Sequence, residues 1–213
     1  MSSFELECTN CPRLAAHLAA VRRDYPQYHA RPVPAFGVEQ PRLLIVGLGP
    51  GMHGANASGR PFTGDHAGIM LYQTLHRFGF STLPESRHKD DGLELIDCRI
   101  TNAVKCLPPA NKPTVEEIKT CNVYLKNEIA AIKGQLLILA LGRIAHEAVL
   151  RCLQLKRKDY DFAHNACHGL GDNRWLVSSY HCSRYNTQTR RLTEQMFHDV
   201  FRNIQKILKK TAQ

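Results

Sequence analysis

The sequence predicts an α/β fold, a three-layer sandwich with helices on both faces of a four-stranded parallel sheet. Four short apolar runs alternate along the chain with stretches of helical periodicity. The runs at 43–48 and 136–141 are apolar on both faces, as in strands buried within a parallel sheet. With 213 residues, the chain is long enough for one domain with a full core, so we expect residues 1–213 to form a single domain.

The expected elements follow one another in a regular order. A short helix over 12–22 leads into a proline-studded connector over 24–41, for which a surface-crossing linker is the default interpretation. Strands are expected over 43–48, 95–104, 136–141 and 175–180. Helices are expected over 65–78, 114–132, 143–153 and at the C-terminal end, and loops over 81–92 and 155–173. Ligands bind outside the carboxyl ends of parallel strands, so the segments that follow the strands should carry the function.

The charge of the chain indicates a class of partner without deciding it. The net charge is +9 and the pI is near 9.3, so the surface attracts polyanions, most simply the phosphates of nucleic acid. Excess lysine and arginine could equally serve only to keep the protein soluble. The start, MSSFELECTNCP, lacks a secretory pattern, and no apolar run is long enough to cross a bilayer. We therefore expect a cytoplasmic protein that does not associate with membranes.

Eight cysteines are many for a chain of this size. Intracellular thiols stay reduced, so clustered cysteines indicate a metal or an iron–sulfur cluster rather than disulfides. The candidate ligands are a C-x2-C pair and two later cysteines, namely Cys8, Cys11, Cys106 and Cys121. Their spacing does not separate zinc from [4Fe–4S], and Cys121 also fits a buried position on its helix. Cys167, with His164 and His168 nearby, is a second and weaker candidate for a metal site.

A glycine-rich segment after the first strand, GLGPGMHGANASGRPFTGD, predicts a pocket for a planar ring. Glycines such as Gly49 let the backbone come close to a ligand. Phe62 offers a stacking surface, although it could also be a core residue. Asp65 could activate water, or it could only cap the helix that begins there. Asn56, in the same segment, is a candidate for holding a water molecule or a phosphate.

Three segments taken together, GLGPGMHGANASGRPFTGD, TNAVKCLPP and YHCSRYNTQTRRLT, resemble the family 5 (type B) uracil-DNA glycosylases. More distantly, they resemble the iron–sulfur family 4 enzymes. The resemblance runs from Cys8 to Thr193. It implies a uracil-DNA glycosylase fold and a monofunctional enzyme that hydrolyses the N-glycosidic bond of uracil in DNA and leaves an abasic site. It also implies a [4Fe–4S] cluster on Cys8, Cys11, Cys106 and Cys121.

The resemblance also implies a role for each site residue. Asn102 matches the uracil-reading asparagine, whose amide offers a donor and an acceptor to the imide edge of the base. His181 matches the histidine of an H-P-S motif and would donate to uracil O2. Phe62 would stack on the base. Leu48 stands where family 4 carries its acid, so the handling of water would pass to Asp65. A turn asparagine and a structural histidine are the plainer alternatives for Asn102 and His181.

The segment 182–193 is implied to enter DNA. Arg184 or Tyr185 could fill the gap left by the flipped base, while Arg190 and Arg191 could hold phosphates. A solvated basic loop is the alternative. This chain has Cys182 where the family usually has proline, and Arg190 where it has glycine.

We expect a monomer that acts on uracil in single- or double-stranded DNA, and the breadth toward other deaminated bases stays open. Two rival functions are weaker. A dinucleotide-binding dehydrogenase fits poorly, because Pro50 interrupts the phosphate-binding pattern. A non-catalytic, zinc- or cluster-stabilised nucleic-acid-binding protein fits the charge and the cysteines. It does not explain why Phe62, Asp65, Asn102 and His181 should meet at one sheet edge.

Overall fold

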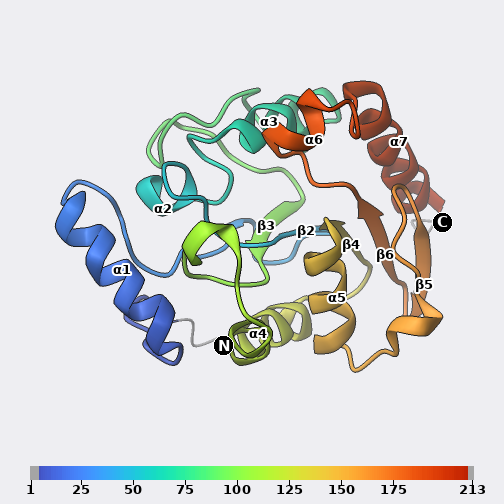
Figure 1. Cartoon of the computed structure of the whole chain (residues 1–213). Coiled ribbons are helices and arrows are strands. Elements are labelled where there is room, and N and C mark those ends of the chain that lie inside the picture. The colour runs from blue at the N-terminus through green and yellow to red at the C-terminus, as the bar shows by residue number, and fades with distance from the viewer. Residues whose placement is uncertain (1–4, 211–213) are drawn as a thin grey trace.

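The computed structural model describes residues 5–210 and confirms the α/β class (Figure 1). Its six strands are β1 (Phe36–Gly37), β2 (Leu43–Gly47), β3 (Cys98–Asn102), β4 (Leu136–Leu141), β5 (Cys167–Gly171) and β6 (Arg174–Ser179). They form one sheet in the order β1-β3-β2-β4-β6-β5. The four central strands are parallel, as predicted, while β1 and β5 pair antiparallel at the two edges. The four-stranded parallel sheet is therefore the centre of a larger mixed sheet.

The helices cover both faces of this sheet (Figure 1). They are α1 (Pro12–Asp24), α2 (Ala55–Ser58), α3 (His66–Arg77), α4 (Val115–Ala131), α5 (Arg143–Cys152), α6 (Arg184–Gln188) and α7 (Glu194–Lys210), with 3-10 turns at Pro109–Asn111 and Arg157–Asp159. Leu43 and Ile45 of β2 join the hydrophobic cluster that holds α3 and α7. Leu44 and Val46 point the opposite way, into the cluster that holds α4 and α5. Within residues 5–210, no helix combines the length and the apolar character needed to cross a bilayer.

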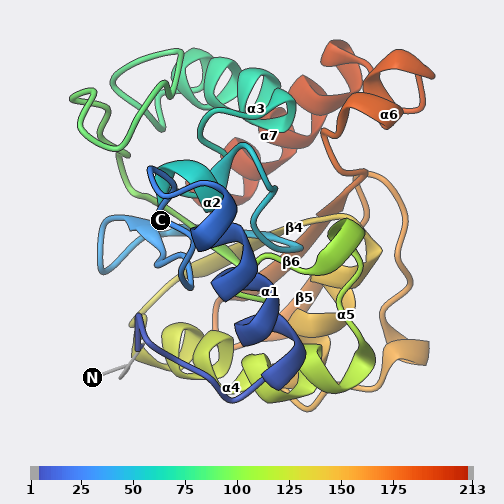
Figure 2. The ribbon, with the colours of Figure 1, turned by 60° about the vertical axis from the view of Figure 1, so that its left-hand side comes forward.

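Helix α1 packs outside the sandwich, as Figure 2 shows. Its buried Leu14, Leu18 and Val21 share a hydrophobic cluster with the segment after β3 and with the side of α4 that carries Cys121. The N-terminal C-x2-C pair is thereby brought next to the two later cysteines.

Four segments expected to be irregular contain regular structure. The connector over 24–41 includes β1, and the loop over 155–173 includes β5, so both expectations were wrong in part. Edge strands escape the apolar pattern because one side of each meets solvent, and β5 alternates exposed and half-buried residues. The short helices α2 and α6 lie in the segments after β2 and β6.

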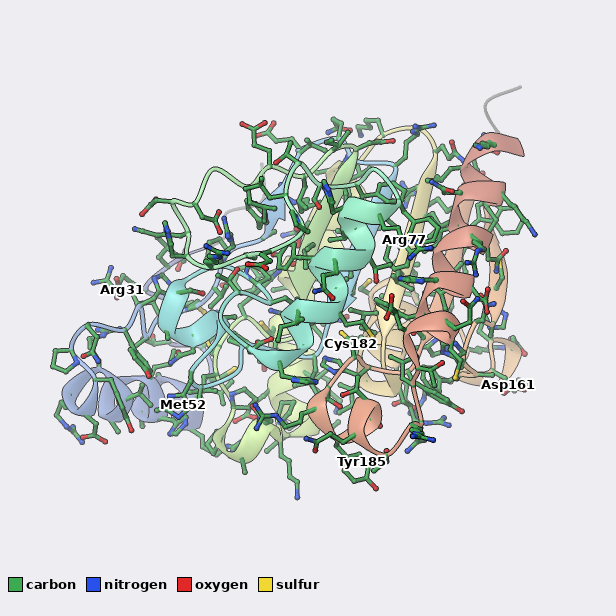
Figure 3. The ribbon with its side chains drawn as sticks, turned by 90° about the horizontal axis from the view of Figure 1, so that it is seen from above. Arg31, Met52, Arg77, Asp161, Cys182 and Tyr185 are labelled. Atoms are coloured by element: carbon green, nitrogen blue, oxygen red, sulfur yellow. The ribbon has the colours of Figure 1, made fainter. Side chains whose placement is uncertain are left out.

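The carboxyl ends of the four parallel strands meet at one edge of the sheet, where the loops that follow them gather. Figure 3 labels Met52 and Tyr185 in the segments after β2 and β6, and both lie along the same side of the molecule. Arg77, the last residue of α3, lies away from that side. The sheet therefore collects the predicted functional segments on one face.

Candidate functional site

A cavity of about 430 Å³ opens at the carboxyl edge of the sheet. Segments after each of the four parallel strands line it. The predicted site residues among its lining are Gly49, Phe62, Asp65, Asn102, His181 and Arg184. The structure thus brings together residues from distant parts of the chain that sequence reasoning had assigned to one pocket.

Phe62 is both a core residue and a wall of this cavity. Its side chain is only 6% exposed, and its ring stacks on that of His181 with centroids 5.9 Å apart and planes 28° from parallel. Its backbone has a φ of +54°, a left-handed conformation that residues with a β-carbon rarely adopt. A β-carbon at Gly47 would lie 2.8 Å from Phe62 Cζ and 2.5 Å from Asn102 Oδ1. The end of β2 therefore needs glycine so that both side chains can enter the pocket.

Asp65 caps α3 and lines the cavity at the same time. Its Oδ1 accepts a hydrogen bond from the backbone N–H of Gly68 at 2.9 Å. Burial raises the pKa of the Asp65 carboxyl, and the N–H groups of Gly68 and Ala67 oppose that rise only in part. A β-carbon at Gly54 would lie 2.5 Å from Asp65 Oδ2, so this loop closes tightly over the carboxylate.

The two asparagines are both buried, and each leaves one amide atom unpaired. Asn102, the last residue of β3, is 2% exposed, and within residues 5–210 its Nδ2 has no hydrogen-bond partner. A buried donor without a partner is costly, and Asn102 lines the cavity, where a ligand could accept this bond. Asn56 lies outside the cavity lining, beneath the loop after β2. Its Nδ2 donates weakly to Met52 O at 3.4 Å, and its Oδ1 finds no partner among the described residues.

His181 follows β6 and lines the cavity beside Phe62, with which its ring stacks. Burial lowers the pKa of its imidazole to about 4, so the ring is neutral at physiological pH and carries one N–H donor. Its backbone carbonyl accepts a hydrogen bond from Asn186 Nδ2 at 2.8 Å. Gly142, directly after β4, has a φ of +96°, and a β-carbon added there would lie 3.5 Å from His181 Cβ. The ring thus packs on Phe62 in the cavity lining, where its polar edge is available to a ligand.

The basic segment after β6 contributes one residue to the cavity and presents others beside it. Arg184 begins α6 and lines the rim, while the neighbouring Tyr185 is 69% exposed. The guanidinium of Arg191 lies 4.9 Å from the centre of the Tyr180 ring, which holds it in place by a cation–π contact. Arg190 has a φ of +56°, a conformation that favours glycine.

Several further residues line the cavity without having been predicted, among them His66, Asn111 and Arg143. His66 follows Asp65, and its Nε2 lies 2.9 Å from Thr187 Oγ1, which joins the start of α3 to α6. Asn111 comes from the turn after the TNAVKCLPP segment and has a φ of +56°. Arg143 stands at the carboxyl end of β4, a position at which the rule for ligands in parallel sheets could have found it.

The four candidate cysteine ligands line one small cavity between α1 and α4, namely Cys8, Cys11, Cys106 and Cys121. The backbone N–H of Lys105 donates to Cys121 Sγ at 3.2 Å, and the hydroxyl of Tyr124 donates to Cys8 Sγ at 3.3 Å. Burial, together with the smaller effect of the neighbouring thiols, raises the pKa of Cys106 to about 12. Four thiols around one cavity suit a bound cationic group, which would stabilise the thiolates.

Four cysteines form the donor set of a structural zinc ion and of a [4Fe–4S] cluster alike. Within residues 5–210, no three cysteine, histidine or acidic side chains lie close enough together to hold one metal ion. The second candidate metal site gains no support from the geometry around it. Cys167 is exposed, and His168 Nε2 lies 2.9 Å from the backbone oxygen of Asp161.

Comparison with known proteins agrees with this geometry. Residues 34–205 match the model of the Uracil DNA glycosylase superfamily. The chain is 46% identical over 198 residues to a Type-5 uracil-DNA glycosylase of Thermus thermophilus, covering 91% of this chain and 90% of that protein. It is 44% identical over 210 residues to a Type-5 uracil-DNA glycosylase of Mycobacterium leprae, covering 94% and 91%. A Type-4 uracil-DNA glycosylase of Pyrobaculum aerophilum is less similar, at 32% identity over 145 residues, covering 68% and 61%.

Proposed function

The chain belongs to the uracil-DNA glycosylase superfamily, and from that premise we propose how its residues remove uracil from DNA. It is a DNA repair glycosylase, a hydrolase that acts on the N-glycosyl bond of uracil. One observation carries the proposed mechanism. Phe62, Asp65, Asn102 and His181 line a single cavity of about 430 Å³, which has room for a flipped base.

Asn102 and Phe62 recognise the base. The ring of Phe62 lies against one face of the flipped uracil, and Gly49 lets the backbone approach it. The unpaired Nδ2 of Asn102 donates to a carbonyl oxygen on the imide edge, which satisfies a buried donor that is otherwise orphaned. Cytosine presents an amino donor in place of a carbonyl, so the same amide nitrogen would face a second donor. This is the proposed basis of selectivity.

His181 stabilises the leaving group. As the N-glycosidic bond breaks, its electron pair passes to the base, and negative charge develops on uracil O2. A neutral imidazole, already desolvated and packed on Phe62, donates its N–H to that oxygen without reorganisation. A donor preorganised in this way is typically worth about 10²–10³ in rate.

Asp65 handles the water. Its carboxylate accepts a proton from a water molecule whose oxygen forms the new bond to the sugar C1′. The products are the free base and an abasic site. The raised pKa makes Asp65 a stronger base than an ordinary carboxylate, and the hydrogen bond from Gly68 fixes its orientation. Among the described residues that line the cavity there is no lysine, which supports a monofunctional glycosylase without strand cleavage.

The basic segment after β6 holds the DNA. We propose that Arg184 or the exposed Tyr185 fills the space that the flipped nucleotide leaves, and that Arg190 and Arg191 contact phosphates. Asn56 is buried outside the cavity lining, so we propose that it acts on the ligand only indirectly, by shaping the loop after β2. The protein is further proposed to act in the cytoplasm, as a monomer and as a single domain over residues 1–213, on single- or double-stranded DNA.

A [4Fe–4S] cluster is proposed on Cys8, Cys11, Cys106 and Cys121. Four thiols around one cavity, with hydrogen-bond donors aimed at two sulfur atoms, support it. When bound, the cluster would supply iron–thiolate bonds that tie α1 to α4 and to the segment after β3. That segment begins directly after Asn102, so the cluster would stabilise the backbone beside the base pocket.

The decisive experiment is excision measured with enzyme in excess over labelled oligonucleotides. Matched single and double strands would carry uracil, hypoxanthine, xanthine or hydroxymethyluracil. Uracil strands should yield alkali-labile abasic sites, while an undamaged strand should stay intact. DNA binding without release of any base by iron-loaded protein would favour the non-catalytic alternative. Visible absorption with iron and sulfide, rather than zinc, should accompany active protein.

A further inference from the structure

A buried guanidinium lies behind the strained residue of the pocket. The side chain of Arg60 is 4% exposed and that of its partner Asp91 is 9% exposed. Arg60 donates to both oxygens of the Asp91 carboxylate, at 2.9 Å and 2.7 Å, and to Ser86 Oγ at 2.5 Å. Buried ion pairs seldom stabilise a fold more than apolar packing would. The pair also lies outside the cavity lining, so its place in the molecule calls for another explanation.

The contacts of this pair converge on the residues on either side of Phe62. Arg60 Nε donates to Thr63 Oγ1 at 3.0 Å, and Thr63 Oγ1 lies 2.6 Å from Ser86 Oγ. The hydroxyl of Tyr72 in α3 donates to the carbonyl of Pro61 at 2.8 Å. The backbone immediately before and after Phe62 is therefore fixed by groups outside its own loop.

Phe62 needs such fixing because its conformation is unfavourable. A φ of +54° is rare for a residue with a β-carbon and persists only where the surroundings enforce it. The Phe62 ring also has little space around it, because it lies so close to Gly47 that a methyl group on that glycine would not fit. If the backbone relaxed, the ring would move relative to Asn102 and His181.

We propose that Arg60 and Asp91, together with Ser86, form a clamp that holds Phe62 in its left-handed conformation, and that they are positioning residues for base excision. The inference rests on the proposed stacking role of Phe62. It gives a function to the charged loop over 81–92, which carries Asp91 and Ser86 to the back of the pocket.

The Asp91 carboxylate of the clamp is held in its ionised form. Burial alone would raise the pKa of Asp91. The Arg60 guanidinium and the N–H groups of Leu93 and Arg87 outweigh burial and hold that pKa well below its usual range. Arg60 also lies 4.8 Å from the centre of the Phe36 ring, which packs its other face.

A double-mutant cycle tests the clamp. Arg60→Lys keeps the charge but loses the planar fork, and it should slow single-turnover excision of uracil roughly 10–10²-fold, the range expected for a small misplacement of a catalytic group. DNA affinity should stay within about twofold, because the clamp touches no proposed DNA contact. Phe62→Ala should also slow excision. The double variant should be no slower than Phe62→Ala alone, because the clamp acts through Phe62.

Arg42→Lys is the matched control. Arg42 pairs with Asp97 through Nε and Oδ2 at 2.6 Å, at the amino end of β2 and away from the cavity. Excision by this variant should equal that of the parent at a temperature well below melting. Should Arg60→Lys fail to fold, Ser86→Ala keeps the ion pair, removes two hydrogen bonds and enters the same cycle with an expected severalfold loss.

The outcomes separate the clamp from the function it serves. If the clamp and Phe62 variants slow excision multiplicatively, Arg60 acts on general stability and the clamp is overturned, while the role of Phe62 stands. If Phe62→Ala excises uracil at the parent rate, the stacking role fails and the clamp fails with it. If the parent itself releases no uracil, the failure lies with the proposed function.

Discussion

Replacing Asp65 by asparagine separates the two tasks that its side chain performs. Asparagine caps a helix about as well as aspartate, so Asp65→Asn keeps the bond to the Gly68 N–H but loses the basic carboxylate. Asp65→Ala loses both. A helix cap is worth about 1 kcal/mol of stability. A general base contributes about 10²–10⁴ in rate, which is about 3–5 kcal/mol of the barrier.

The two variants should therefore share a rate defect and differ in stability. Single-turnover excision should fall by about 10²–10⁴ in both. Asp65→Ala should melt below the parent, whereas Asp65→Asn should melt at or above it at neutral pH. The reason for the second expectation is the buried charge. Because burial raises the pKa of Asp65 in the folded state, its contribution to stability is present at low pH and is lost as pH rises through the folded pKa. The neutral amide avoids that loss.

The raised pKa of Asp65 also determines where the excision rate declines at acid pH. Excision by the parent should decline as pH falls through the raised pKa of Asp65, at a higher pH than an ordinary aspartate would give. Asp65→Asn should lose this limb. Parent-like excision by Asp65→Asn, with only Asp65→Ala melting early, would show that Asp65 is a cap and nothing more.

Four other expectations follow from the geometry. His181→Ala should lower the excision rate by about 10²–10³ while DNA binding persists, and a rate equal to the parent's would refute the donor role. The excision rate of the parent should show no titration of this ring until the pH nears 4. Asn102→Ala should narrow the preference for uracil over cytosine, measured on paired oligonucleotides, and unchanged selectivity removes its reading role. Arg190→Ala and Arg191→Ala should weaken binding equally on damaged and undamaged DNA, and each should flatten the salt dependence by about one phosphate contact; an unaltered slope places them off the DNA. Cys106→Ser should yield protein with less iron and lower visible absorbance, and full iron content would exclude it as a ligand.

Much of the fold could be predicted because its central strands are apolar on both faces. The runs at 43–48 and 136–141 are short and apolar on both faces, which is typical of buried parallel strands. The edge strands lack this signature. The turn of the β5–β6 hairpin has a weak signal in the sequence, the pair Asp172 and Asn173. Both residues adopt positive φ, as a tight two-residue hairpin turn requires, and aspartate and asparagine are types that accept it. A β1 of two residues is too short for any periodicity to report.

Part of the candidate site could likewise be predicted from the sequence, and part could not. Asp65, Asn102 and His181 could be predicted to converge, because each follows or ends a strand of one parallel sheet. The sequence carries no trace of how Phe62 stacks on His181, because that contact depends on a left-handed backbone at Phe62. Nor could it reveal Arg60 behind the pocket, since its partners come from a loop whose path only the folded chain determines.

The missing side chain at Gly47 has a genetic consequence. Any other residue there would place a β-carbon against both Phe62 and Asn102, the two side chains proposed to hold uracil. Deamination of the cytosine opposite either of the first two bases of a glycine codon gives, after replication, a codon for serine, arginine, aspartate or glutamate. At codon 47 of its own gene, the lesion that this enzyme repairs is one that would disable it.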